Sequence, residues 1–137
     1  MRILGGFDEY IGPRIEVTII GTCKDYNVAS LIDTGFSGSL AVPLHVIAKI
    51  GAEKIAVGAV TLADGSTQII PIFSGKIKIG IDEFEILILV TGDEVLLGME
   101  LLSKYEFHGK PATGEFYMDT EPSVKKLTES LKKMRVA

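Results

Sequence analysis

The chain has 137 residues, a length typical of one domain, of which 47% are hydrophobic and 23% charged. This balance is too hydrophobic for a disordered protein, and a net charge of −4 argues against a general nucleic-acid or anionic-membrane binder. The single Cys cannot form an internal disulfide, and one Cys with two His cannot build a Cys/His zinc site. We therefore expect no metal and no cofactor, and any chemistry to come from carboxylates or hydroxyls.

The N-terminal residues lack the apolar run of about 7–15 residues that a signal peptide needs. The longest apolar candidate elsewhere, residues 86–90, is far shorter than the roughly 20 residues that span a bilayer. We expect a soluble, cytoplasmic protein without a membrane partner.

Most apolar segments are short, rich in β-branched residues and separated by turn residues, which predicts strands. Asp64-Gly65 is a strong hairpin signal because both residues tolerate positive φ. In chain order the expected hairpins are 15–32 with its turn at 24–27, 55–73 with its turn at Asp64-Gly65, 76–90 with its turn at 80–83, and 105–118 with its turn at 111–114.

Three segments predict helices. Residues 43–50 begin with Pro43, which is favourable at a first helical position, and end before Gly51. Residues 99–104 allow one or two turns, and residues 123–135 carry an amphipathic stripe. Because strands outnumber helices, we expect a mostly β barrel or sandwich with peripheral helices.

The charge is unevenly distributed along the chain. Residues 123–137 carry five basic residues and one acidic residue, so this segment has a net charge of +4 and the rest of the chain −8. A solvated helix face explains this pattern. The sharper alternative is a helix that docks on an acidic patch of the same chain or of a partner subunit.

The most distinctive segment is an apolar strand that runs into Asp33 and is followed at once by Thr34 and Gly35. The strand would hold the carboxylate at the edge of a hydrophobic region, and Gly35 would let the chain turn sharply. Such a rigid carboxylate is what general acid–base catalysis requires. The plainer interpretation is that Asp33 only begins a turn, because Asp-Thr-Gly is common in turns.

Two further features favour a site over a simple turn. The later run Leu96-Leu97-Gly98 leads into a short helix, and Gly98 lets another backbone segment approach closely. The Asp64-Gly65 hairpin lies between the two motifs in the sequence, where it is placed to fold over the Asp33 loop as a lid.

This order of strand, Asp-Thr-Gly, hairpin, apolar-apolar-Gly and short helix resembles the retropepsin-like aspartic proteases. The run 33–38, with Leu40, Val42 and Pro43, resembles more narrowly their bacterial and archaeal single-domain branch. The resemblance covers about residues 14–102. It implies a closed β-barrel of the retroviral-protease type.

We expect a single domain spanning residues 1–137. Its core would occupy about residues 14–104, and the late hairpin and C-terminal amphipathic helix, at 105–137, exceed the minimal family core. We expect this tail to cover the core or to extend a dimer interface.

The resemblance also implies a role for each motif residue. Asp33 would be the catalytic carboxylate, one per subunit, supported by Thr34 and Gly35. Leu97 and Gly98 would back the active site. The substrate-binding positions would be Phe36, Ser37, Ala63, Asp64, Gly65 and Ser66.

The family reaction is peptide-bond hydrolysis by a water held between two carboxylates, but this chain has one Asp-Thr-Gly. The later run Asp119-Thr120-Glu121 has Glu in place of the turn Gly and cannot serve. The resemblance therefore implies a homodimer in which two Asp33 carboxylates meet on a two-fold axis, Thr34 bonds across the interface, and a polypeptide is the substrate.

Some positions depart from the family pattern. Phe36 stands where well-known members have Ala or Ser. Glu100 stands near the sequence position at which retroviral enzymes have a conserved Arg, so the ion pairs by which that Arg stabilises their dimer do not carry over. Two other functions stay open. One is a non-catalytic peptide- or protein-binding module on the same fold, and the other is a monomeric barrel in which Asp33 only caps a turn.

Other residues give weaker signals. Ser37 lacks the Gly two residues later that a serine-hydrolase elbow needs. Cys23, beside a turn, is expected to be an inert thiol. His45 and His108 are expected to be structural or surface residues, since no motif links them.

Overall fold

The computed structural model describes residues 1–119, and these residues are mostly strand. The predicted amphipathic helix at 123–135 lies outside the described residues. The strands are β1 (Arg2–Leu4), β2 (Gly6–Phe7), β3 (Pro13–Ile20), β4 (Asp25–Ile32), β5 (Leu40–Val42), β6 (Glu53–Thr61), β7 (Thr67–Ile79), β8 (Asp82–Val90), β9 (Leu96–Leu97), β10 (Glu106–Lys110) and β11 (Glu115–Asp119), and the helices are α1 (Leu44–Ile50) and α2 (Met99–Leu102).

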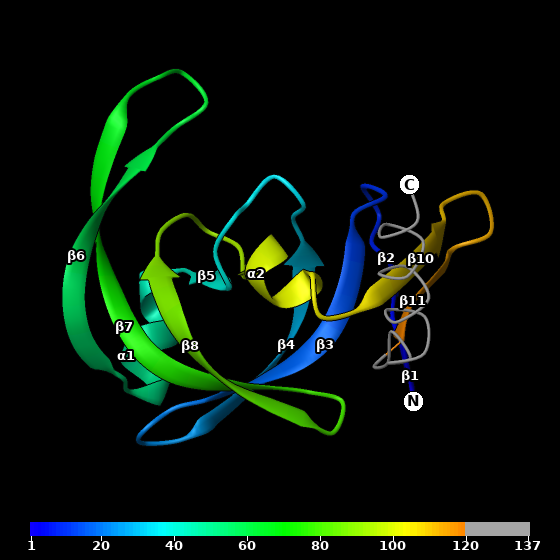
Figure 1. Cartoon of the computed structure of the whole chain (residues 1–137), viewed down its shortest axis with the longest axis horizontal. Coiled ribbons are helices and arrows are strands. Elements are labelled where there is room, and N and C mark those ends of the chain that lie inside the picture. Colours follow the sequence, from blue (N-terminus) through cyan, green and yellow to red (C-terminus); the bar gives the residue numbers. More distant parts are fainter. Residues whose placement is uncertain (120–137) are drawn as a thin grey trace, which may run out of the picture.

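Two sheets organise the described residues (Figure 1). The larger one has the strand order β2-β3-β4-β9-β5-β8-β7-β6, and an additional β3–β7 pairing links its two halves. The smaller one has the order β1-β11-β10. Neither α1 nor α2 has the length and apolar character needed to cross a bilayer.

All four expected hairpins form between the described strands. The position of the first turn was wrong, because Asp25–Asn27 pair with β3 instead of turning. The turn lies at residues 21–24, where the Gly21 amide donates to the Lys24 carbonyl (3.1 Å) and the Cys23 amide donates to the Ile50 carbonyl (2.8 Å). The end of α1 therefore fixes this turn, a long-range effect that local turn propensity does not include.

The core lies between the strands of the larger sheet and α1. On β3, Ile15, Val17 and Ile19 are at most 2% exposed, and they alternate with more exposed residues as expected for strand periodicity. From α1, Val46 and Ile50 enter the same cluster. Pro43 occupies the position before the first helical residue rather than the first helical position itself.

The late hairpin contributes to this core as well. Phe116 and Met118 of β11 are buried in the main cluster, and Phe116 packs edge-on against Phe7 of β2. In the small sheet β11 lies between β10 and β1, and its pairing with β1 places Arg2 opposite Asp119. The first and last described strands are therefore joined in one small sheet.

Candidate active site

Asp33 lies directly after β4, at the start of the loop that leads to β5. Its backbone amide donates to the Leu97 carbonyl (3.0 Å), which continues the parallel pairing of β4 with β9. One carboxylate oxygen, Oδ1, accepts the Gly35 amide (2.9 Å). Among the described residues no hydrogen bond to Oδ2 occurs, so the loop fixes the carboxyl group through one oxygen.

The residues beside Asp33 differ in exposure. Thr34, Gly35 and Ser37 are exposed, whereas Asp33 and Phe36 are half-buried. In the described part of the chain, the Thr34 hydroxyl forms no side-chain hydrogen bond. The structure thus presents a carboxylate and a hydroxyl side by side at the surface of a single chain.

Gly98 brings the second motif against this loop. Its amide donates to the Ser39 carbonyl (2.9 Å), and the next amide, of Met99, donates to the Phe36 carbonyl (2.8 Å). A Cβ at position 98 would lie 2.1 Å from the Gly38 carbonyl oxygen and 2.6 Å from the Phe36 ring. The close approach expected at Gly98 is therefore present, and only glycine fits.

Phe36 packs its ring inside the loop. A Cβ at Gly38 would lie 2.7 Å from the ring, as close as one at Gly98. Two glycines therefore make room for the ring. Leu97, which precedes Gly98, is fully buried and anchors β9 in the core.

The lid-like hairpin β6–β7 extends beyond the rest of the molecule, at the end where the Asp33 loop also lies (Figure 1). At its tip Gly65 has φ +84°, but Asp64 does not have positive φ, so only one of the two residues takes the conformation that the turn signal allows. Asp64 Oδ1 accepts the Ser66 hydroxyl (2.6 Å) and amide (2.9 Å), and these hydrogen bonds lower the pKa of Asp64. None of the hydrogen bonds within the described part of the chain joins Ala63–Ser66 to the Asp33 loop.

An ion-pair cluster around Arg14 was missed at the sequence level. Its guanidinium donates to Asp8 (2.9 Å), to Glu94 (2.7 Å) and to the Ala29 carbonyl (3.1 Å). It thereby ties the β2–β3 loop to the segment that precedes β9. The partners lie 6 and 80 residues away in sequence, so no local motif indicates them.

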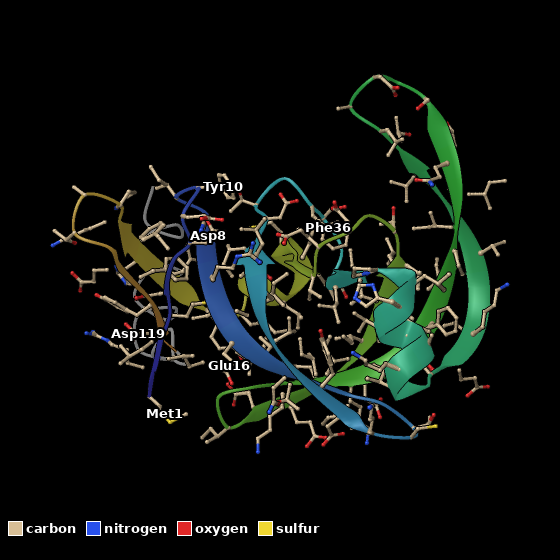
Figure 2. All side chains as sticks on the ribbon, turned by 180° about the vertical axis from the view of Figure 1, so that it is seen from behind. Met1, Asp8, Tyr10, Glu16, Phe36 and Asp119 are labelled. Carbon is tan, nitrogen blue, oxygen red and sulfur yellow. The ribbon has the colours of Figure 1, made fainter. Side chains whose placement is uncertain are left out.

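The β2–β3 loop held by this cluster lies at the same end of the molecule as Phe36 (Figure 2). Asp8 accepts the amides of Tyr10 (2.9 Å) and Gly12 (2.8 Å), and Ile11 between them has φ +62°. The backbone bond from Gly12, followed by the bond from Arg14, lowers the pKa of Asp8. The loop is therefore held by several hydrogen bonds, and its exposed tip carries Tyr10 and Ile11 at the same end of the molecule as Phe36.

A hollow of about 660 Å³ lies elsewhere on the described surface. Its lining includes Gly21, Gly51, Ser74 and Glu85, and no residue of the Asp33 loop or of the hairpin tip. The half-buried Asp33 is therefore not part of this hollow.

No protein-family model and no curated protein matches the chain. Among solved structures, the chain is similar to a retropepsin-like aspartic protease from Rickettsia conorii, with a TM-score of 0.59 and 20% sequence identity. The match covers 86% of this chain and 89% of the other. At this identity the similarity establishes the fold, which is the retropepsin-like fold that the motif order predicts.

Proposed function

We propose that this chain, which has a retropepsin-like fold, is one subunit of a homodimeric aspartic endopeptidase. The observation that carries the proposal is how the surrounding backbone holds the Asp33 carboxyl group. One of its carboxylate oxygens is fixed by the loop backbone, and the loop itself is fixed by the amides of Gly98 and Met99. The exposed Thr34 hydroxyl lies next to it in the sequence.

In the proposed reaction a water is held between two Asp33 carboxyl groups, one from each subunit. The ionised carboxylate accepts a proton from the water, whose oxygen forms a bond to the carbonyl carbon of the peptide. The protonated carboxyl donates a hydrogen bond to the carbonyl oxygen. Two carboxyl groups a few Å apart do not both ionise readily, so they share one proton and titrate as a pair.

The second carboxyl group is proposed to come from another copy of the chain, because the sequence has one Asp-Thr-Gly. A two-fold axis at the Asp33 loop would bring the same residues together from both copies. The exposed Thr34 hydroxyl would then bond across the interface. The Gly35 amide holds Asp33 Oδ1, and Leu97 and Gly98 would support the loop from behind.

A polypeptide substrate would lie between the Asp33 loop and the hairpin tip formed by Ala63, Asp64, Gly65 and Ser66. The exposed apolar side chains of this hairpin support the assignment, since Val57 is 62% and Ile69 is 74% exposed. Neighbouring exposed apolar side chains commonly mark a surface that binds a partner. Phe36 and Ser37 would border the bound peptide on the opposite side.

The direct test is cleavage of a denatured protein or a peptide library by the wild type and by Asp33→Asn. We expect the Asn variant to lose at least about a hundredfold in rate, the scale of general acid–base catalysis. The matched control is Asp25→Asn, which changes an exposed acid at the start of β4, the strand that leads to Asp33. This variant should retain full activity. Equal cleavage by wild type and Asp33→Asn would disprove the catalytic role.

The pH profile is a second test. One carboxyl of the pair must keep its proton, so activity should be highest at acidic to mildly acidic pH and decline above neutrality. A rate that continued to increase beyond pH 8 would contradict the paired-carboxylate mechanism. Peptide binding by wild type and Asp33→Asn alike, with no turnover by either, would instead identify a non-catalytic binding module.

A further inference from the structure

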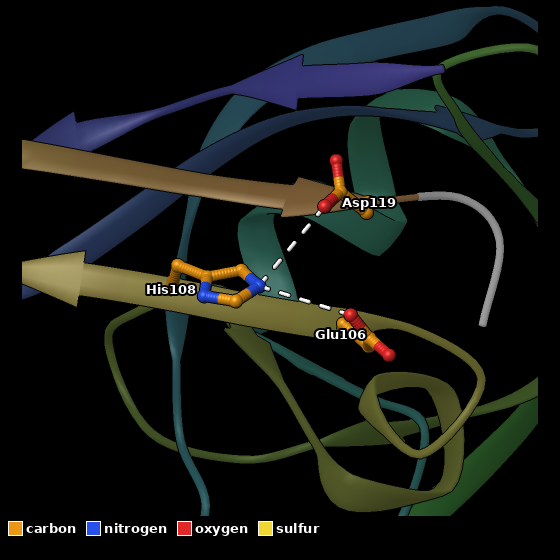
Figure 3. A group of neighbouring side chains, drawn as sticks. All are labelled: Glu106, His108 and Asp119. Carbon is orange, nitrogen blue, oxygen red and sulfur yellow. Dashed lines mark ion pairs between the residues drawn. The ribbon is translucent and has the colours of Figure 1, made fainter. Parts of the chain in front are cut away.

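The small sheet carries a second group of titratable side chains, Glu106 and His108 on β10 and Asp119 on β11 (Figure 3). Glu106 is directly opposite Asp119 in the antiparallel register, and His108 follows two residues later. Because side chains alternate between faces with a period of two, all three project from one face of the sheet. His108 has no role in the proposed peptidase.

The distances from His108 to the two carboxylates are too long for hydrogen bonds but fit a shared ion. His108 Nε2 lies 3.9 Å from Glu106 Oε2 and 4.0 Å from Asp119 Oδ2, and one ligand atom from each residue lies within 4.8 Å of the others. Ligand atoms around a tetrahedral zinc ion, with bonds of about 2.0–2.1 Å, are roughly 3.3 Å apart. Both distances from His108 exceed this spacing, so side-chain rotations would have to draw the ligand atoms closer around an ion.

Neighbouring residues hold two of the three ligands in place. The His108 ring stacks on Tyr117 of β11, with ring centroids 4.8 Å apart and planes at 24°. Arg2 of β1 binds Asp119 through Oδ1 (3.3 Å), whereas it is Oδ2 that lies near His108. Such outer contacts orient metal ligands, so the site is partly preorganised.

We propose that Glu106, His108 and Asp119 bind a divalent transition-metal ion of the Zn²⁺ class. One imidazole with two carboxylates suits such ions, whereas Ca²⁺ and Mg²⁺ prefer oxygen ligands alone. Water would complete the coordination. The ion would connect β10 to β11, and through Asp119 and Arg2 it would also secure β1.

The test is titration of the full chain with ZnCl₂ by calorimetry, in a Cys23→Ser background that removes the lone thiol. We expect one ion per chain, at least tenfold weaker binding for His108→Ala, and no change for His45→Ala. His45 is the matched control because it is the other His in the sequence and lies on α1, outside this group. MgCl₂ should produce no comparable binding.

Two further measurements make the outcome decisive. Zn²⁺ should raise the melting temperature of the wild type but not of His108→Ala, since an ion that binds only the folded state stabilises it. Arg2→Gln should bind Zn²⁺ several times more weakly, because the contact that orients Asp119 is lost.

If His108→Ala does not fold, Glu106→Gln combined with Asp119→Asn tests the same site. Absence of a Zn²⁺-dependent melting shift in the wild type at millimolar concentration would refute the proposal. Zn²⁺ binding that is unchanged by the ligand substitutions would refute it equally.

Discussion

Gly98 occupies a position where two backbone segments approach more closely than any side chain allows. A Cβ there would meet the Gly38 carbonyl oxygen at 2.1 Å, and a carbonyl cannot rotate away as a flexible side chain can. We expect Gly98→Ala to lower the free energy of unfolding by about 2–3 kcal/mol, as overpacking does, and to displace the Asp33 loop. Urea unfolding measures this effect. Gly6→Ala, at a site with no heavy atom within 4 Å of a built Cβ, should change stability far less, and equal effects would contradict the steric argument.

Asp8 gives a pH-dependent prediction at the same scale. Hydrogen bonds from the Gly12 amide and then from Arg14 lower its pKa in the folded chain below the ordinary value of 3.8. Its contribution to stability is therefore complete above about pH 4 and is lost as the pH falls through the folded-state pKa. The melting-temperature difference between wild type and Asp8→Asn should be constant from pH 7 to 5 and shrink below pH 4. Glu9→Gln, the neighbouring acid, should show no such difference, and a gap that widened in acid would contradict the assignment.

At the scale of the elements, Tyr105 connects the β7–β8 hairpin to the segment after α2. Its hydroxyl lies 3.1 Å from Asp82 Oδ2, to which it donates a hydrogen bond. Burial, with a smaller effect of the Asp82 charge, raises the pKa of Tyr105 above its ordinary value of 10.0. The stability from this neutral hydroxyl is therefore present below about pH 10 and is lost as the pH rises towards the folded-state pKa.

Tyr105→Phe should accordingly cost about 1 kcal/mol of unfolding free energy at pH 7.5, the typical contribution of a hydrogen bond. The difference from wild type should narrow above pH 10, because the unfolded wild-type chain then gives up its phenol proton. Denaturant unfolding at pH 7.5 and pH 11 measures both effects. Tyr10→Phe, at an 85% exposed position, is the control, and a wild-type advantage that persisted at pH 11 would rule out the linkage.

The strands also show which parts of the fold could be predicted from the sequence. Hairpins joined by short turns were predictable, because Asp64-Gly65 and the alternating residues around it act locally. The pairing of β4 with β9 was not readable from strand patterns, since β9 has two residues and no periodicity. β1, β2 and β5 were missed for the same reason. They are strands because neighbouring strands supply hydrogen bonds.

In the candidate site, too, local motifs were predictable and long-range contacts were not. Asp33, Gly35 and Gly98 were identified because their chemistry is carried by residue type within short motifs, and the structure brings them together. The Arg14 cluster was not predictable, because Glu94 is 80 residues from Arg14 and the three charges form no motif. The orientation of Phe36 towards its own loop depends on the space left by Gly38, which appears only in three dimensions.

At the scale of the whole molecule, the proposed shared dyad would make activity a property of pairs of chains. If wild type and Asp33→Asn are mixed in equal amounts and allowed to exchange subunits, about a quarter of the dimers contain two wild-type chains. We expect peptidase activity to fall to about a quarter of the value for the same total amount of wild type. A mixture of wild type with Asp25→Asn should retain full activity. A value of about one half would mean that each chain acts alone and would contradict the shared dyad.

The β1–β11 pairing has a consequence for how the chain folds. Arg2 and Asp119 are 117 residues apart in sequence, so their contact closes a loop that contains nearly all of the described chain. The entropy lost in closing a loop increases with its length, and pairings of such high contact order form slowly. The β3–β4 and β7–β8 hairpins have far shorter loops to close. We therefore expect the small sheet to assemble after these hairpins, as the step that completes folding.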